Sequence, residues 1–243
     1  MKKILLIDDN NEISKKLFEM LSLPSSRLEA TRLDIKEFLN LNETDKLLKK
    51  VVHSKPDKYD CMIIAPMSFS YDHTGDQKTR LDFKVWDELF GINLKIPALL
   101  MDHADKIVKK DGSIINLISA DYMLGSFVSK IYSASMAAKV SLVKSYANLL
   151  GKQKIRVNGV AAGWVREVMN EESYPKALLN EILKFTPIER MASAEEIAKV
   201  FCWLASKEAS FISGQVIHVD GGYYNVDPVT RLEGDCVKIQ GTL

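Results

Sequence analysis

Short apolar runs alternate with longer amphipathic stretches along almost the whole chain, and this alternation limits the possible folds more than any other feature. A run of four to eight apolar residues suits a buried strand, whereas apolar residues at intervals of three and four suit a helix with one buried side. Strands that alternate with helices predict a parallel sheet covered by helices on both faces. The chain is therefore expected to form a doubly wound α/β fold.

Six segments carry the strand pattern and four carry the helical pattern. The expected strands are Lys3–Ile7, Leu28–Leu33, Cys61–Ala65, Ser113–Ile118, Ile155–Ala161 and Gln215–Val219. The expected helices are one that begins near Ile13 and ends before Pro24, followed by Leu94–Val108, Ile131–Leu150 and Ala194–Leu204. No repeat, linker or low-complexity tract interrupts this order, so the 243 residues are expected to form one domain.

The charge balance and the apolar runs exclude several classes of protein. The chain has 33 basic and 32 acidic side chains, and this near-neutral balance gives no reason to expect a nucleic acid or an anionic membrane as partner. The longest apolar runs are too short to cross a bilayer, and the N-terminal run before Asp8 is too short for a secretory signal. Three scattered cysteines predict neither a disulfide framework nor a zinc site. A cytoplasmic location is expected.

Several short motifs follow one another in a fixed order in the second half of the chain. Asn116-Leu-Ile-Ser119 ends an expected strand, and Tyr132-Ser-Ala-Ser-Met136 opens an expected helix. The remaining motifs are Ile155-Arg-Val-Asn-Gly-Val-Ala-Ala-Gly163, Pro187-Ile-Glu-Arg190 and Phe211–Gly222. Together they resemble the short-chain dehydrogenase/reductase family, especially its ketoacyl-carrier-protein reductase branch. The resemblance implies a single Rossmann-like domain over residues 1–222, with residues 223–243 as a C-terminal extension.

The resemblance also implies a catalytic group of Ser, Tyr, Lys and Asn, of which three members are kept. Ser119, Tyr132 and Asn93 match by position, and the Tyr of the family exchanges a proton with the substrate oxygen. Met136 stands at the position of the Lys, which in the family holds the nicotinamide ribose and lowers the pKa of the Tyr. A thioether can do neither of these things. The tetrad is incomplete, and whether the chain is an enzyme stays open.

The segment that should bind the dinucleotide differs from the family as well. Members carry a glycine-rich turn after the first strand, because only glycine lets the backbone approach a pyrophosphate closely. Here no glycine precedes Gly75, and Asp8, Asp9 and Glu12 would put carboxylates near the phosphates. The Asn-Asn-Ala-Gly motif of the family is replaced by Ile63-Ile-Ala-Pro66. No NAD(P) cofactor is therefore expected.

Two further departures concern the nicotinamide and the ribose. The family's Thr that meets the nicotinamide amide corresponds to Glu167, which is the candidate general base if chemistry survives. Thr31–Ile35 resembles the family's third strand, yet it directly follows the first helix. One strand–helix unit, which carries the ribose-recognising residue in the family, is therefore expected to be missing, leaving six strands.

The helices Leu94–Val108 and Ile131–Leu150 match those that form a four-helix interface between subunits in the family. The second helix carries Ala134, Ala137 and Ala138, which permit close approach, and later apolar residues that cover more of its circumference than one sheet face requires. A dimer or tetramer, or a hetero-oligomer with an intact family member, is expected. Lys139 is expected to be a surface or interface lysine.

Three functional hypotheses remain open. The first is an enzyme that uses Ser119 and Tyr132 for cofactor-independent acid–base chemistry on a carbonyl or hydroxyl compound of a biosynthetic pathway, either free or bound to an acyl carrier. The second is a non-catalytic subunit that pairs with an intact reductase of the same family. The third is a weak NAD(P)H-dependent ketoreductase, the only one of the three that requires a cofactor.

Overall fold

The computed structural model describes residues 2–26, 28–35, 44–53, 57–69, 81–124, 129–169 and 174–225. In this part of the chain six parallel strands form one sheet in the order β2-β1-β3-β4-β5-β6. The strands are β1 (Lys2–Asp8), β2 (Leu28–Asp34), β3 (Tyr59–Ile64), β4 (Val108–Ser119), β5 (Arg156–Ala162) and β6 (Val216–Val219). The expected six-stranded parallel α/β fold is confirmed.

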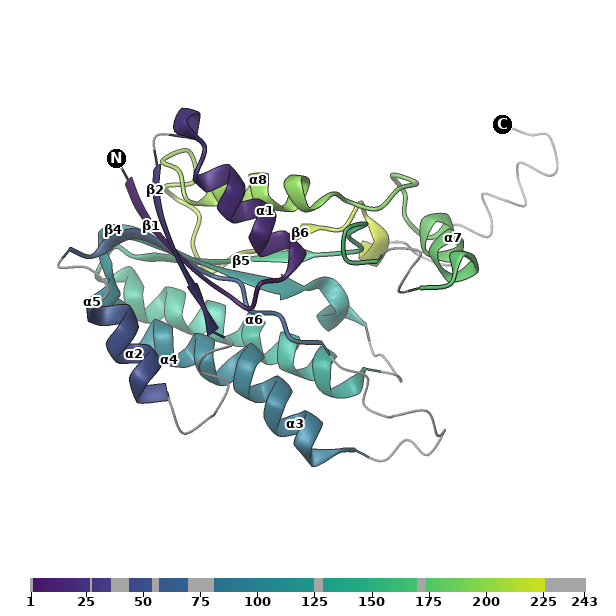
Figure 1. Cartoon of the computed structure of the whole chain (residues 1–243), viewed down its shortest axis with the longest axis horizontal. Coiled ribbons are helices and arrows are strands. Elements are labelled where there is room, and N and C mark those ends of the chain that lie inside the picture. The colour runs from purple at the N-terminus through teal and green to yellow at the C-terminus, as the bar shows by residue number, and fades with distance from the viewer. Residues whose placement is uncertain are drawn as a thin grey trace.

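Helices cover both faces of the sheet (Figure 1). They are α1 (Glu12–Leu21), α2 (Thr44–His53), α3 (Phe83–Phe90), α4 (Ile96–Asp102), α5 (Ala104–Ile107), α6 (Lys130–Gly151), α7 (Lys176–Lys184) and α8 (Ala194–Leu204). Helices α1 and α8 lie on one face, and α2, α4 and α6 lie on the other. Within the described ranges, no helix is both long and apolar enough to span a membrane.

Strand β2 forms one edge of the sheet and pairs with β1 alone, in continuous register from Lys2 opposite Leu28 to Asp8 opposite Asp34. In the sheet order 3-2-1-4-5-6 of dinucleotide-binding domains, a further strand lies outside the second one. No described strand takes that place here. In the part of the chain that the structure describes, the sheet therefore has one strand fewer on this side, as expected from the missing strand–helix unit.

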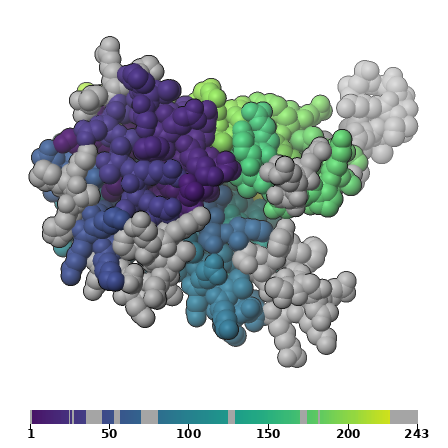
Figure 2. All heavy atoms as spheres, in the orientation of Figure 1, coloured from purple at the N-terminus to yellow at the C-terminus, as the bar shows by residue number. Residues whose placement is uncertain are grey.

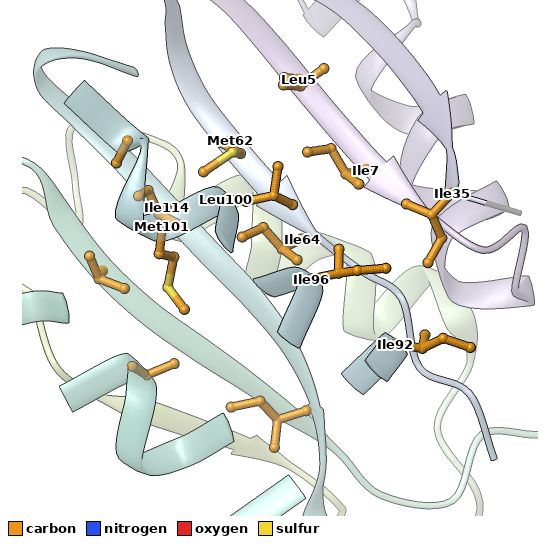
Figure 3. Packing of buried hydrophobic residues seen from close by; sticks show 14 of the residues in the cluster. Leu5, Ile7, Ile35, Met62, Ile64, Ile92, Ile96, Leu100, Met101 and Ile114 are labelled. Carbon is orange, nitrogen blue, oxygen red and sulfur yellow. The ribbon is translucent and has the colours of Figure 1, made fainter. Parts of the chain in front are cut away.

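The core consists of two apolar layers, one on each face of the sheet. Successive side chains of a strand point to opposite faces, so Leu5 and Ile7 of β1 pack toward α4 whereas Ile4 and Leu6 pack toward α1 and α8. Figure 3 shows the first layer, where side chains of β1, β3 and β4 meet those of α4. Burial on both faces explains why β1 is a continuous apolar run rather than an alternating one.

The expected helix Leu94–Val108 is wrong at both ends. The helical region begins earlier, at Phe83, and passes through a π-helix (Gly91–Lys95) into α4. His103 leaves helical geometry with φ −104° and ψ 19°, and Val108 is already the first residue of β4. Helices α2 and α7 are additional to those expected. Each has few buried apolar side chains, Leu47 and Val51 in α2 and Leu179 and Ile182 in α7, so the periodic signal is short.

Much of the apolar surface of α6 is used within the chain. Val140, Val143 and Leu150 are buried, and the hydroxyl of Tyr146 donates to the carbonyl of Ala98 in α4 at 3.2 Å. Leu149 is 59% exposed. The apolar circumference of this helix is therefore a weaker argument for an interface than the sequence implies, because α4 covers part of it.

The N-terminal elements and the C-terminal elements occupy different parts of the surface. In the space-filling view, the purple and blue residues of the N-terminal elements lie beside the green residues that belong to the C-terminal helices (Figure 2). Strand β4 runs toward the side where α6 begins and where the described chain ends (Figure 1). This carboxyl edge of the sheet carries the residues considered next.

Candidate active site

Ser119 and Tyr132 meet at the carboxyl edge of the sheet. Ser119 is the last residue of β4, and Tyr132 lies in the first turn of α6, which returns the chain along the sheet. The side chain of Ser119 lies beside the Tyr132 phenol, and Tyr132 is only 4% exposed. Burial raises the pKa of Tyr132, and the nearby Ser119 hydroxyl lowers it by less. The phenol therefore stays protonated at neutral pH and can act as a hydrogen-bond donor.

Met136 lies one turn beyond Tyr132 on the same face of α6 and is fully buried. Its sulfur accepts a hydrogen bond from the backbone N–H of Ser119 at 3.4 Å. A thioether is a weak acceptor and carries no proton to donate. The side chain at this position thus helps to hold the end of β4 but offers no charge to the Tyr132 phenol.

Asn93 lies in the π-helix and connects three elements. Its side-chain oxygen accepts from the backbone N–H of Ser68, and its nitrogen donates to the carbonyl of Ser68, both at 2.9 Å. The same nitrogen donates to the hydroxyl of Ser135 at 3.2 Å, and that hydroxyl donates to the carbonyl of Tyr132 at 2.7 Å. Asn93 therefore reaches Tyr132 through Ser135 and the backbone, while it fixes the segment after β3.

Lys139 is fully buried, and its expected place at the surface or an interface is wrong. Position 139 follows Tyr132 by seven residues, or two helical turns, and shares the buried face of α6. The ammonium nitrogen donates to the carbonyl of Pro66 at 3.1 Å. Desolvation by burial lowers the pKa of Lys139 to about 7, and the charge of Asp9 raises it by less. Like Asn93, Lys139 therefore donates a hydrogen bond to the segment that follows β3.

An ion pair between Asp8 and Arg32 stabilises the turn that follows β1. Asp8, the last residue of β1, is fully buried and accepts two hydrogen bonds from Arg32 of β2, at 2.8 and 3.0 Å. Its carboxylate also accepts the backbone N–H of Asn10 at 2.6 Å, and the side chain of Asn10 accepts from Arg32 at 2.7 Å. Such a two-pronged contact between guanidinium and carboxylate is among the stronger polar contacts in proteins. The charge of Asp8 is therefore neutralised within the chain.

Asp9 and Asn11 satisfy the polar backbone groups around the same turn. Asn11 caps α1, because its side-chain oxygen accepts the backbone N–H of Ser14 at 2.9 Å. Its side-chain nitrogen donates to Asp9 at 2.6 Å and to the carbonyl of Ala65 at 2.8 Å. The other oxygen of Asp9 accepts the backbone N–H of Met67 at 3.0 Å. Side chains of the protein itself thus bind amide groups that lie around the start of α1.

Glu167 lies at the start of α8. One carboxylate oxygen accepts the backbone N–H of Ala194 at 3.0 Å, and the other pairs with the guanidinium of Arg166 at 3.3 Å. A negative charge at a helix N-terminus is stabilised by the free amides and the helix dipole. The structure does not bring this side chain into contact with Ser119 or Tyr132 among the residues that it describes.

Asp121 and Tyr224 form a second polar pair at the carboxyl edge of the sheet. Asp121 lies in the 3₁₀-helix Ala120–Met123, and its backbone N–H donates to the hydroxyl of Ser119 at 3.3 Å. The hydroxyl of Tyr224 donates to one oxygen of the Asp121 carboxylate. Burial, followed by the negative charge of Asp121, raises the pKa of Tyr224, and the same charge adds to burial in raising the pKa of Tyr132. The carboxylate therefore lies near both phenols.

A tight turn after β6 holds Tyr224 in place. Asp220 accepts the backbone N–H groups of Gly222 at 3.0 Å and of Tyr224 at 3.2 Å. Gly221 and Gly222 have φ of +63° and +85°, a region that side chains disfavour and glycine adopts readily. A Cβ atom at Gly163 would lie 2.7 Å from Asp220, so the end of β5 packs directly on this turn. The backbone that carries Tyr224 is thus fixed from two sides.

Of the four site residues expected from the sequence, three are linked and one is separate. Ser119 and Tyr132 are in contact, Asn93 reaches them through Ser135, and Glu167 lies at another helix. Asp121 and Tyr224 were not expected. The available signals were an acidic residue two positions after the motif serine and a tyrosine after Asp-Gly-Gly. Among the described side chains, no three His, Cys, Asp or Glu residues lie close enough together to hold a metal ion.

The sequence of this chain is similar to those of acyl-thioester oxidoreductases. A family model described as Enoyl-(Acyl carrier protein) reductase matches residues 5–224. The 3-oxoacyl-(acyl-carrier-protein) reductase FabG of Thermotoga maritima is 30% identical over 188 residues, which are 76% of this chain and 74% of that protein. The (3R)-3-hydroxyacyl-CoA dehydrogenase of Homo sapiens is 30% identical over 57% of this chain and 54% of its own length.

The fold is similar to those of solved structures as well. A short chain dehydrogenase family protein from Francisella tularensis superposes with a TM-score of 0.75 over 93% of this chain and 100% of that one, at 20% identity. A short-chain dehydrogenase/reductase from Serratia marcescens gives a TM-score of 0.74 over 92% and 98%, at 19% identity. At this level of identity the similarity supports the fold alone.

Proposed function

The chain belongs to the short-chain dehydrogenase/reductase family, and we propose that it performs acid–base chemistry on a carbonyl or hydroxyl compound without a nicotinamide cofactor. The observation that carries the proposal is the contact of Ser119 with both Tyr132 and Met136. The pair that would bind a substrate oxygen is together, while a thioether lies where the family has the lysine that serves cofactor and phenol. The relatives named above act on acyl thioesters, which makes a small or carrier-bound acyl compound the proposed substrate class.

The chemistry of Ser119 and Tyr132 follows from their protonation. Met136 offers the Tyr132 phenol no ammonium, and burial raises its pKa, so the phenol is a donor rather than a base. Two hydroxyl donors directed at one carbonyl oxygen stabilise the negative charge that develops on it when a neighbouring C–H bond is broken. This arrangement suits dehydration, isomerisation or proton exchange next to a carbonyl better than hydride transfer.

The residues around the first turn do not suit a bound dinucleotide. A pyrophosphate at the start of α1 would need free backbone amides and a nearby positive potential. Instead the N–H groups of Asn10, Ser14 and Met67 are bound by side chains of the chain, and the carboxylates of Asp8 and Asp9 lie there. The guanidinium of Arg32 is already paired with Asp8. These contacts support the proposal that the chain does not use NAD(P).

Thermal unfolding with and without NADH or NADPH tests the missing cofactor directly. A ligand at 100 times its dissociation constant adds about 2.7 kcal/mol to the free energy of unfolding, which raises the melting temperature of a chain of this size by several degrees. We expect no rise at millimolar cofactor, with an intact reductase of the family as the positive control. A clear rise for this chain would instead support the NAD(P)H-dependent ketoreductase.

Turnover without cofactor tests the activity. The N-acetylcysteamine thioester of 3-hydroxybutyrate, incubated in D₂O, is expected to take up deuterium at C2 or to lose water in the presence of the protein. The Ser119→Ala and Tyr132→Phe variants are each expected to reduce this rate by about 10²-fold or more, the size of effect seen when an oxyanion donor is lost. A wild-type rate no higher than that of buffer contradicts the proposed activity for this substrate class.

A second candidate function, a non-catalytic subunit, is favoured by the outer face of α6. Ala134, Ala137 and Ser141 are exposed there, and Leu149 is 59% exposed. Small exposed residues along a helix allow another helix to approach closely, so this face suits a second copy of the chain or an intact family member. Co-expression with intact reductases from the same cell, followed by affinity purification, shows whether the partner is a second copy of the chain or a reductase. Recovery of a stoichiometric complex with a reductase would favour the subunit.

A further inference from the structure

Besides the hydroxyls of Ser119 and Tyr132, the site contains the carboxylate of Asp121. Acid–base chemistry next to a carbonyl needs a group that removes the proton from carbon, and neither neutral hydroxyl can do this. The expected candidate, Glu167, has both oxygens bound at the start of α8. Asp121 accepts one hydrogen bond, from Tyr224, and no described residue donates to its other oxygen. A carboxylate oxygen to which no described residue donates is able to accept a proton from a substrate.

Building on the proposed function, we propose that Asp121 is the catalytic base of this site and that Tyr224 is the positioning residue that orients its carboxylate. The substrate is then an enolisable carbonyl compound, with the carbonyl oxygen at Ser119 and Tyr132 and the adjacent C–H group facing Asp121. The base comes from the same short segment as the serine, since only Ala120 separates Ser119 from Asp121.

The 3₁₀-helix that carries Asp121 is fixed at several points. The backbone N–H of Asp121 bonds to the hydroxyl of Ser119, so the base and the donor are held in one local structure. The next residue, Tyr122, shares a hydrogen bond of 2.6 Å with the ring of His218 in β6. Tyr224 approaches from the turn held by Asp220. A base fixed in this way loses little freedom when a substrate binds.

Among the described residues, the titratable groups whose pKa the charge of Asp121 raises are phenols. They come from the 3₁₀-helix Tyr223–Asn225, which supplies Tyr223 and Tyr224, and from α6, which supplies Tyr132. Burial and the charge of Asp121 both raise the pKa of Tyr224 and of Tyr132. Both phenols therefore stay protonated at neutral pH, and Asp121 supplies the carboxylate of the group.

The proton transfer is balanced without a cofactor. The C–H bond next to the carbonyl breaks, its proton moves to the free oxygen of Asp121, and the electron pair of the bond moves toward the carbonyl oxygen. Hydrogen bonds from Ser119 and Tyr132 stabilise the resulting enolate. The protonated Asp121 then exchanges its proton with the solvent and delivers a deuteron to the same carbon, or it delivers the proton to another carbon or to a departing hydroxyl group. The products are exchange, isomerisation and loss of water, respectively, and nothing is oxidised or reduced.

The test uses the exchange assay on the full chain with 3-hydroxybutyryl N-acetylcysteamine thioester. Asp121→Asn keeps an oxygen that can accept from Tyr224 but cannot take a proton, and we expect its rate to fall by at least 10²-fold. Asp105→Asn, an exposed aspartate of α5, is the matched control and is expected to leave the rate unchanged. Melting curves confirm that each variant is folded.

Tyr224→Phe separates a positioning role from a structural one. A phenol that only orients the base acts on the chemical step and not on substrate binding, so its removal should lower kcat and leave KM unchanged. We expect kcat to fall about tenfold at a wild-type KM. An unchanged kcat, or a loss of kcat that is matched by a lower melting temperature, would mean that Tyr224 has a structural role only and would overturn this part of the proposal.

The outcomes distinguish this inference from the proposed function. Exchange that requires Ser119 and Tyr132 but survives Asp121→Asn overturns the assignment of the base and leaves the proposed function standing. Exchange that is lost in Glu167→Gln and kept in Asp121→Asn assigns the base to Glu167 instead. If the wild-type chain shows no exchange, the proposed function fails for this substrate class and the inference fails with it.

Discussion

Replacing Lys139 with Met removes a buried ammonium from the middle of α6 while nearly keeping the length of the side chain. The nitrogen donates a hydrogen bond to the carbonyl of Pro66, and burial lowers the pKa of Lys139 from 10.5 to about 7. At 1.4 kcal/mol per pKa unit, holding this group charged in the folded protein costs about 5 kcal/mol below pH 7. The Lys139→Met variant does not bear this cost.

The sign of the pH dependence follows from the protons bound in each state. Between about pH 7 and pH 10.5 the unfolded chain holds the Lys139 proton and the folded chain does not, so the free energy of unfolding rises with pH in this window. The destabilisation is absent above pH 10.5, grows as the pH falls, and is complete below pH 7. From pH 7 to pH 9 wild type should gain about 2 kcal/mol relative to Lys139→Met.

Urea unfolding followed by circular dichroism at pH 7, 8 and 9 measures this difference. Other titrating groups are common to both proteins and cancel in the comparison. Lys144→Met, an exposed lysine of the same helix, is the control and should show the same pH dependence as wild type. Parallel curves for wild type and Lys139→Met would refute the reasoning, because they would mean that the buried nitrogen keeps its proton throughout the range.

Three further outcomes are expected. Met136→Lys alone should not create NADPH-dependent reduction of a 3-oxoacyl thioester, since Asp8, Asp9 and the bound amides remain; measurable cofactor oxidation would show that the first turn is no obstacle. Arg32→Gln should lower the free energy of unfolding by about 3 kcal/mol, because it leaves the buried Asp8 carboxylate unpaired, whereas Lys15→Gln at an exposed pair should change it by less than about 0.5 kcal/mol. Sedimentation at micromolar concentration should give a dimer or tetramer through α6; a stable monomer would speak against both that interface and the subunit hypothesis.

The sequence predicts much of the fold because the spacing of apolar residues along a short segment shows which of its sides are buried against the sheet. The continuous apolar run of β1 predicts a strand covered on both faces, and its side chains do pack into both layers. The spacing along α8 predicts Ala194–Leu204, which is the helix observed. Its start is also marked locally, by the capping box of Ser193 and Glu196.

Local patterns do not determine where a helix changes its geometry or what covers its far side. The π-helix at Gly91–Lys95 and the break at His103 lie within a stretch whose apolar spacing gives no sign of either. Lys139 has the sequence context of an exposed lysine, and its burial depends on the segment after β3, which is 73 residues earlier in the chain at Pro66.

Part of the candidate site was determined by the sequence alone. Ser119 and Tyr132 stand in a strand–helix unit, and parallel topology requires that the end of such a strand and the start of the following helix share one edge of the sheet. The sequence also places Met136 beside Tyr132, because the two residues are one helical turn apart in the expected helix.

The remaining contacts were decided by the tertiary structure. Asp121 and Tyr224 are 103 residues apart, and they meet because the glycine turn after β6 sends the chain back over the end of β4. Glu167 is drawn to the free amides at the start of α8 rather than to Tyr132. Periodicity and motif spacing describe neighbours along the chain, whereas these contacts depend on which strand ends and turns come together when the sheet is assembled.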